Sequence, residues 1–367
     1  MPSLSERVLD LVAASGATRR EFARRIGLDE SKFSKSITGT RRFSSLDLAR
    51  IAEECDVTVD WLITGEQSPL AATAARGTGG SAEAALAAAE RYSALRSDMT
   101  ALGYGRTWQS VVTVAKGRYD EQGRVLAVQA RARMQGAGDT VDTGTLATAI
   151  EDVFGADVTI VELGAGFDGL AACTPDVKLI VLATSRTPTR QRFTLAHELG
   201  HLLAGDDQEI HVDPDVYDRD RAREPSEMRA NAFASEFLMP EARIRSAVGQ
   251  AALTERSFAE MVCEFGVSPS TLAYRLLKLR LIDAGSCDRF KRTTSAEAAR
   301  LAGFGTRFAQ HVVEAAAPRV PRLLAQDCYS AYEAGAATLR PYANLLDRDV
   351  DELRHELEST EGAPEAR

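Results

Sequence analysis

The pentapeptide His197-Glu198-Leu199-Gly200-His201 decides how the rest of this chain is interpreted. In a helix, side chains four residues apart leave the same face one turn apart, so His197 and His201 can bind one Zn²⁺ at about 2.0–2.1 Å each. Glu198 projects beside them, where its carboxylate can accept a proton from water. The apolar spacing of residues 192–196 predicts a helix that is buried around this polar face. The pattern predicts metal-dependent hydrolysis; the alternative is a surface helix with solvated histidines.

A zinc hydrolase normally has a third protein ligand and leaves the fourth position to water. Residues 225–240 predict a second helix, with Ser226 as its N-cap and Pro240 as its end. Glu227 and Asn231 share one face of that helix with two alanines, which permit a close approach to the first helix. We therefore expect Glu227 to reach the metal and Asn231 to hydrogen-bond a ligand imidazole.

Other residues compete for these roles. Glu224 and Glu236 are rival carboxylates, and helical spacing alone does not exclude Glu224. His211 is another candidate ligand, but it falls in the polar stretch Asp206–Asp220, which predicts a mobile loop. The helix of residues 225–240 could also be an ordinary amphipathic helix whose carboxylate faces water.

Taken together, the two segments resemble the ImmA/IrrE family of zinc metallopeptidases. The resemblance is carried by Gln191-Arg192-Phe193-Thr194-Leu195-Ala196-His197-Glu198-Leu199-Gly200-His201 and by Glu227…Ala230-Asn231-Ala232-Phe233-Ala234…Leu238-Met239-Pro240. It spans roughly Thr140 to Asp283 and implies a minimal thermolysin-like core. It also implies His197, His201 and Glu227 as zinc ligands, Glu198 as general base, and a helix-turn-helix repressor as substrate.

The fold class that follows is α+β, with a small sheet beside the active-site helix. Three short apolar or alternating segments bounded by glycine and proline turns predict its strands: Asp157–Leu163, Gly169–Ala172 and Lys178–Leu182. Upstream, Ser81–Asp98, Tyr104–Tyr119 and Val125–Met134 predict connecting helices.

The N-terminus predicts an all-α bundle. Five helices are expected near Leu4–Ala14, Arg19–Ile26, Glu30–Thr38, Leu46–Cys55 and Val59–Leu62, with Trp61 buried between them. The run Gly27-Leu28…Lys32-Phe33-Ser34-Lys35…Thr38-Gly39-Thr40-Arg41-Arg42, followed by Trp61-Leu62-Ile63-Thr64-Gly65, resembles the XRE/Cro-like helix-turn-helix domain. This resemblance covers about residues 4–65 and implies operator DNA as a partner.

Residues 1–42 contain nine Lys/Arg against five Asp/Glu, a formal charge of +4 in a chain of net charge −9. Such a local basic footprint suits DNA. The expected contacts are Ser31, Lys32, Ser34 and Lys35 from the recognition helix, with Lys35, Arg41 and Arg42 on phosphates. A bundle used only for dimerisation or protein binding is the alternative, so a homodimer stays open.

Composition agrees with a cytoplasmic regulatory protein of several domains. The 367 residues are 44% hydrophobic and 26% charged, no apolar run reaches the roughly 18 residues that span a bilayer, and the N-terminus lacks a signal-peptide core. Five scattered cysteines without a CxxC pair predict reduced thiols. The expected divisions are a DNA-binding domain (1–66), a linker and helical connector (67–139), a peptidase domain (140–283), a helical C-terminal region (284–357) and a disordered tail (358–367).

A second helix-turn-helix pattern covers Phe258–Leu279, and packing against the peptidase is the favoured interpretation over DNA or repressor binding. The sequence thus predicts a DNA-binding regulator that carries a zinc endopeptidase and cleaves a helix-turn-helix repressor or its own N-terminal domain. The alternative is a non-enzymatic regulator whose peptidase fold senses a ligand or metal. Glu198 favours hydrolysis, because a purely structural metal site does not need it.

Overall fold

The computed structural model describes residues 3–55, 57, 59–64, 80–111, 116–135, 141–164, 167–205, 210–213, 224–249 and 253–358. The chain divides into two compact units, Met1–Arg76 and Gly77–Arg367, which are treated separately below. Residues 65–79, which include the start of the expected linker and helical connector (67–139), lie outside the described residues.

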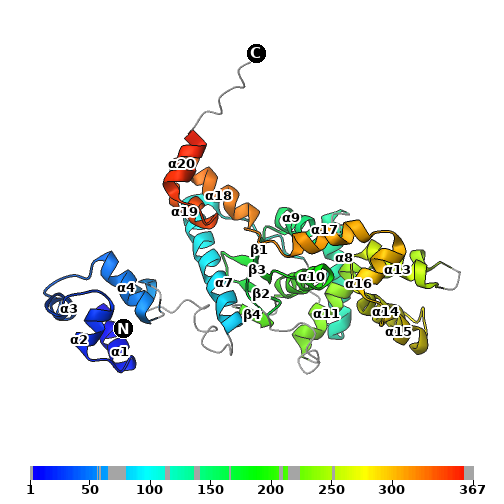
Figure 1. Cartoon of the computed structure of the whole chain (residues 1–367), viewed down its shortest axis with the longest axis horizontal. Coiled ribbons are helices and arrows are strands. Elements are labelled where there is room, and N and C mark those ends of the chain that lie inside the picture. The colour runs from blue at the N-terminus through cyan, green and yellow to red at the C-terminus, as the bar shows by residue number, and fades with distance from the viewer. Residues whose placement is uncertain are drawn as a thin grey trace, which may run out of the picture. The chain divides into compact units, whose positions relative to one another are not determined.

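The described part of the first unit is entirely helical (Figure 1). Its elements are α1 (Leu4–Ala14), α2 (Arg19–Arg25), α3 (Glu30–Ile37), α4 (Ser45–Cys55) and α5 (Val59–Thr64). Capping boxes at Ser3 and Thr18 start α1 and α2, because each side chain accepts the backbone N–H of a glutamate three residues on. Asp29 caps α3 through the N–H groups of Ser31 and Lys32. The predicted helices of this unit are therefore confirmed.

Two features of the bundle core differ from the expectation. Trp61 is only partly buried, and Leu62, beside it, is the residue of α5 that enters the core. The guanidinium of Arg7 is buried and donates hydrogen bonds to the carbonyl oxygens of Leu62 and Ile63 at 2.8–3.1 Å. These bonds satisfy carbonyls at the end of α5, where a helix leaves its last acceptors without partners.

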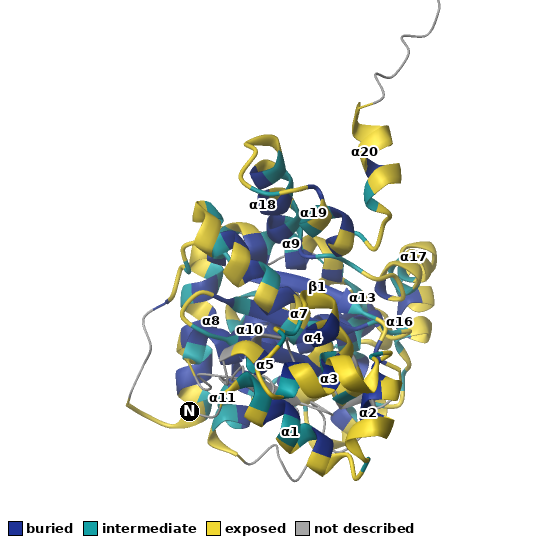
Figure 2. Cartoon of the chain, turned by 90° about the vertical axis from the view of Figure 1, so that its left-hand side faces the viewer, coloured by how far each residue is buried: buried dark blue, intermediate teal, exposed yellow. Residues whose placement is uncertain are grey.

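The second unit is built around a four-stranded sheet with the order β1-β3-β2-β4. Its strands are β1 (Asp157–Val161), β2 (Gly169–Cys173), β3 (Lys178–Ala183) and β4 (Ile210–Asp213). β1 and β3 are parallel, whereas β2 runs antiparallel to both β3 and β4. The central strands are almost continuously buried, and β1 is dark blue in Figure 2. Helices α7 and α10 both contact β2 and β3, which lie between them in Figure 1.

The described helices of the second unit are α7 (Gly80–Met99), η1 (Thr100–Tyr104), α8 (Tyr119–Met134), α9 (Thr143–Phe154), α10 (Pro188–Ala204), α11 (Pro225–Leu238), α12 (Glu241–Val248), α13 (Glu255–Phe265), α14 (Pro269–Lys278), α15 (Ala284–Phe290), α16 (Ser295–Ala302), α17 (Gly305–Ala315), α18 (Arg322–Glu333), α19 (Arg340–Leu345) and α20 (Val350–Glu358). Helices α8–α16 share one large apolar core with the sheet, whereas α18–α20 pack together in a separate small cluster. Because α8 and α13–α16 contribute side chains to that core, parts of the expected connector and C-terminal region pack as one body with the expected peptidase segment. No helix in the described ranges is long and apolar enough to cross a membrane.

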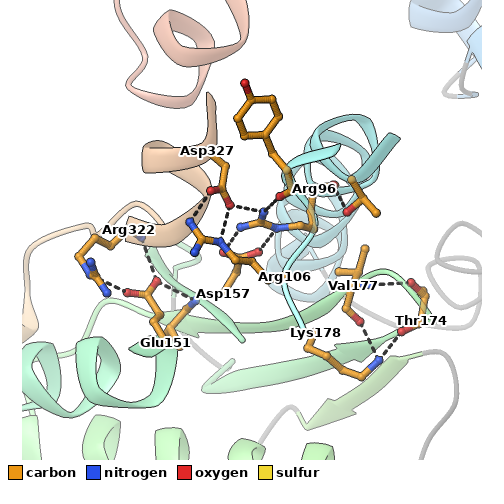
Figure 3. A network of polar contacts seen from close by, with 12 residues as sticks. Arg96, Arg106, Glu151, Asp157, Thr174, Val177, Lys178, Arg322 and Asp327 are labelled. Atoms are coloured by element: carbon orange, nitrogen blue, oxygen red, sulfur yellow. Dashed lines mark hydrogen bonds and ion pairs between the residues drawn. The ribbon is translucent and has the colours of Figure 1, made fainter. Parts of the chain in front are cut away.

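A buried ion-pair network attaches α7 and α18 to the sheet (Figure 3). The guanidinium of Arg96 on α7 donates two 2.7 Å hydrogen bonds to Asp157 at the start of β1 and one of 2.6 Å to Asp327 on α18. Arg106 completes the network on Asp327. Burial raises the pKa of Asp157, and the hydrogen bonds and charge of Arg96 oppose that rise. The C-terminal helices α18–α20 are thus anchored to the sheet through α18.

Four predictions in this unit are wrong or need correction. Residues 105–111 and 116–118 are not helical, so the helix expected over Tyr104–Tyr119 is absent there. Within Asp206–Asp220, expected to be a loop, residues 210–213 form the edge strand β4. The N-cap of α11 is Glu224, and Ser226 already lies inside the helix behind Pro225. Glu358 still belongs to α20, while residues 359–367 of the expected tail lie outside the described residues.

Candidate metal centre

Helix α10 carries the His-Glu-x-x-His segment into the centre of the second unit. The helix starts at Pro188, where the missing backbone N–H of proline costs nothing because the first helical N–H has no acceptor within the helix. It ends at Gly205, which adopts a left-handed conformation (φ 67°). Over its last three turns almost every residue is buried. The exposed fractions of His197, Glu198 and His201 are 0%, 0% and 2%. Polar side chains buried this deeply require charged or hydrogen-bonding partners.

Helix α11 supplies the third group. The two Nε2 atoms of His197 and His201 lie 3.0 Å apart. The carboxylate of Glu227 approaches both, with one oxygen 3.3 Å from His197 Nε2 and the other 3.4 Å from His201 Nε2. Glu227 is itself only 3% exposed. Two ring nitrogens and a carboxylate therefore converge on one point between the helices, as the sequence predicted for these three residues.

The spacing of these atoms fits a tetrahedral metal ion. Ligand atoms about 2.05 Å from Zn²⁺ in a tetrahedron lie about 3.3 Å from one another, close to the three observed separations. The donor set of two imidazoles and one carboxylate is also that of catalytic zinc sites that leave one position open. A hydrogen-bonded His–Glu cluster would show similar separations, so metal content is the property that distinguishes the two.

The close approach of α11 depends on small residues on both helices. Ala230 and Ala234 are fully buried, as expected from the sequence. Gly200 provides the matching gap on α10, because a Cβ at that position would lie 3.0–3.2 Å from three atoms of Phe233. This contact went unpredicted; its only sequence signal is a glycine inside a helix, where it costs about 1 kcal/mol relative to alanine.

The rival ligands have other surroundings. Glu224 is exposed at the start of α11, and Glu236 forms a buried ion pair with Arg275 of α14. Glu236 also accepts the backbone N–H of Glu241 at 3.1 Å, so its carboxylate organises the end of α11. The backbone of His211 pairs with Ala171 in the sheet, and its side chain lies outside the described residues.

Asn231 lines a groove along α11. The groove has a volume of about 550 Å³ and runs between α11, α14 and the start of α8, with Phe193, Met228 and Tyr274 among its lining residues. In the described part of the chain, no hydrogen bond joins the half-buried Asn231 to either imidazole. Its expected role in orienting an imidazole stays a prediction. Two of the lining residues are neighbours of proposed ligands in the sequence, since Phe193 lies one turn before His197 and Met228 directly follows Glu227.

The second helix-turn-helix pattern is part of this same body. Phe258, Val262 and Phe265 of α13 and Leu272 and Leu276 of α14 belong to the main core. Other side chains of α14 line the groove between α14 and α11. Helix α14 is therefore a structural part of the second unit. The expectation that this segment packs against the peptidase segment is confirmed.

In the first unit, five of the six expected DNA contacts are exposed: Ser31, Lys32, Ser34, Lys35 and Arg42. Arg41 differs, because its guanidinium pairs with the buried carboxylate of Asp47 at 2.8 Å and donates to Ser36 Oγ at 2.9 Å. It therefore ties the end of α3 to the start of α4. Contact with DNA stays a prediction for all six.

Comparison with known proteins supports a metallopeptidase for part of the second unit. Residues 152–277 match the IrrE N-terminal-like domain family. A radiation response metalloprotease IrrE from Deinococcus radiodurans is 37% identical over 123 residues, which is 33% of this chain and 37% of the relative. The protein of the same name from Deinococcus deserti is 36% identical over 106 residues, 29% of this chain and 38% of the relative. The matches to these relatives thus span less than two fifths of either one, and the family match at residues 152–277 includes α10 and α11.

Proposed function

We propose that the second unit is a zinc-dependent endopeptidase and that the first unit is a DNA-binding domain fused to it. The convergence of His197, His201 and Glu227 on one buried point carries the peptidase proposal. The IrrE-like match over residues 152–277 supports it independently, because that match rests on sequence similarity and not on geometry.

In this proposal the two imidazoles and the Glu227 carboxylate hold the metal, which would supply Lewis-acid activation of the peptide carbonyl and of water. Glu198 is the general base. It follows His197 on the same helix, so its side chain is rotated by about 100° from the ligand face and can lie beside the metal without binding it. Its carboxylate accepts the proton of the attacking water and later delivers it to the leaving amine. Burial of the site keeps bulk water away from this proton transfer.

Metal content tests the ligand assignment. Purified protein should contain about one zinc per chain, and Glu227→Ala should lose most of it. Glu224→Ala is the matched control, since Glu224 is an exposed carboxylate three residues earlier. Full zinc occupancy in Glu227→Ala, measured by inductively coupled plasma mass spectrometry, would refute the assignment.

We further propose that the substrate is a helix-turn-helix repressor or the N-terminal domain of this same chain. The candidate site for an extended segment is the groove of about 550 Å³ between α11 and α14. The exposed basic and hydroxyl side chains of α3 support operator DNA as the partner of the first unit. Saturable binding of residues 1–66 to promoter DNA would be lost with increasing salt if phosphates dominate.

The second candidate function is a sensor that does not cleave. The nearly complete burial of the site favours a sensor, because a peptide has no exposed route to its polar side chains in this conformation. These side chains are His197, Glu198, His201 and Glu227. Glu198→Gln separates the two, since it removes the base but keeps the ligands and the shape of the side chain. If cells with wild type and with Glu198→Gln show the same regulation and no repressor fragment on immunoblots, the protein is a sensor.

A further inference from the structure

A cleft lies between helix α17, the start of α10 and the end of α13. Helix α17, orange in Figure 1, contacts α10 and also α16, which supplies one more wall. The cleft has a volume of about 40 Å³, and because one water molecule needs roughly 10–15 Å³ on this measure, it holds about three water-sized groups. None of the described residues that line it belongs to the metal-ligand group. The cleft is therefore a separate candidate site.

The interior of the cleft is apolar. Val262, Val267 and Ala299 line it and are only 3%, 1% and 1% exposed. Phe304 and Phe308 of α17 line it as well, and Phe304 remains 41% exposed. A short apolar group placed in the cleft would cover this surface, and removing apolar surface from water favours binding.

The charged side chains of the cleft lie at its solvent-exposed edge. Arg307 is exposed and His311 is half-buried, and their spacing of four residues puts both on one face of α17. Among the described residues, no hydrogen bond or ion pair engages either side chain, and no acidic side chain lines the cleft. Both groups are therefore open to a ligand that enters from solvent.

Two further observations indicate that the cleft is electropositive. Burial raises the pKa of the Cys263 thiol in the cleft, and the charge of Arg307 partly opposes that rise, so the guanidinium acts on the interior. The start of α10 adds positive potential, because its N-cap Thr187 makes no side-chain hydrogen bond to the first N–H groups. The cleft thus favours an anionic group over a cationic one.

We propose that this cleft binds a small monocarboxylate, whose carboxylate pairs with Arg307 while its short apolar tail enters the interior. A guanidinium presents two parallel N–H donors that match the two oxygens of a carboxylate. A dianion such as phosphate fits less well, because its remaining oxygens would leave water to face the apolar interior. The site does not depend on the peptidase proposal.

The test measures the binding of four small molecules to the full chain by calorimetry: butyrate, butyramide, butylamine and inorganic phosphate. Butyrate should bind at one site per chain with a Kd below about 10 mM, and the other three should bind at least about tenfold more weakly. Butyramide removes the charge, butylamine reverses it, and phosphate keeps it without the tail. If any of these binds as tightly as butyrate, or if butyrate does not bind below about 10 mM, the proposal is overturned.

A pair of arginine variants ties the binding to this cleft. Arg307→Ala should weaken butyrate binding about tenfold or more, because the carboxylate loses its charged donor. Arg300→Ala is the matched control, since Arg300 is an exposed arginine of α16 outside the cleft lining, and it should bind butyrate as the wild type does. Equal butyrate affinity in the two variants would refute the assignment.

Cys263 gives a second readout in the wild-type chain. Its thiol is half-buried in the cleft, whereas the half-buried Cys173 lies on β2, outside it. Saturating butyrate should slow the alkylation of Cys263 by iodoacetamide several-fold and leave that of Cys173 unchanged, as measured by peptide mass spectrometry. Unchanged alkylation of Cys263 in saturating butyrate would place the molecule outside the cleft and overturn the proposal.

Discussion

Replacing Gly200 with alanine tests whether the contact between α10 and α11 holds Glu227 against the two histidines. The new Cβ would lie 3.0, 3.1 and 3.2 Å from Cδ1, Cγ and Cβ of Phe233. Ordinary carbon contacts are about 3.5–4.0 Å, so one side must retreat by roughly 0.5 Å. Phe233 is fully buried and its ring stacks on Phe237 at 5.3 Å, which leaves α11 itself as the part that moves.

The magnitude follows from two opposing effects. Overpacking of a core costs about 1–3 kcal/mol, and alanine recovers about 1 kcal/mol over glycine inside a helix. The net loss in the free energy of unfolding is up to about 2 kcal/mol, with Tm lower by about 2–4 °C per kcal/mol. The metal centre is more sensitive, because zinc ligands tolerate displacements of only about 0.2 Å. We expect zinc affinity to fall about tenfold or more.

The assay is competition for zinc with a chelator of known affinity, alongside thermal unfolding. Gly285→Ala, in the first turn of α15, is the control, because its Cβ would meet only one atom, at an ordinary 3.6 Å. That variant should keep its zinc affinity. If Gly200→Ala also keeps the wild-type zinc affinity and Tm, the reasoning from helix spacing to metal binding is refuted.

Three further predictions concern charged groups. Arg42→Ala should weaken DNA binding and reduce its salt dependence while Tm stays unchanged. Arg41→Ala should weaken DNA binding and also lower the Tm of the first unit, because the buried Asp47 carboxylate loses its ion pair. Burial raises the pKa of Asp47, but hydrogen bonds from Ser44 and the Arg41 ion pair outweigh it, so the pKa lies below the ordinary 3.8. A carboxyl group whose pKa is lower in the folded state than in the unfolded state stabilises the fold above its unfolded-state pKa, and this stabilisation is lost as pH falls through its folded-state pKa. The free energy of unfolding of residues 1–66 should therefore decrease below about pH 4. The decrease should be less steep in Arg41→Ala, which lacks the ion pair. Asp327→Asn should cost the second unit about 3–5 kcal/mol in chemical denaturation, because Arg96 and Arg106 lose a buried carboxylate, and unchanged stability would contradict the anchoring of α18.

Local patterns predicted what depends on local physics. The predicted starts of the second and third helices follow from the side-chain caps at Thr18 and Asp29, because each cap acts within three residues. The i, i+4 spacing of His197 and His201 likewise predicted that their imidazoles would meet. The edge strand β4 went unpredicted because four residues in a polar setting carry almost no periodic signal, and its pairing with β2 comes from tertiary structure.

The choice among neighbouring carboxylates is one part that local patterns could not decide. Helical spacing alone did not exclude Glu224, although the alanines on the face of Glu227 favoured Glu227, and the resemblance to a family agreed with that choice. The structure gives the physical reason: α11 presents Glu227 to α10, and Arg275, 39 residues further along the chain, occupies the carboxylate of Glu236. A carboxylate already neutralised by a buried guanidinium is a poor ligand, since binding a metal would leave that cation without its partner at a cost of several kcal/mol. Helical geometry acts in the same direction, because Glu236 lies nine residues after Glu227, about 13 Å further along α11 and on its opposite face. It follows that Arg275→Met should lower Tm, because the buried Glu236 carboxylate loses its ion pair, while the zinc content stays that of the wild type.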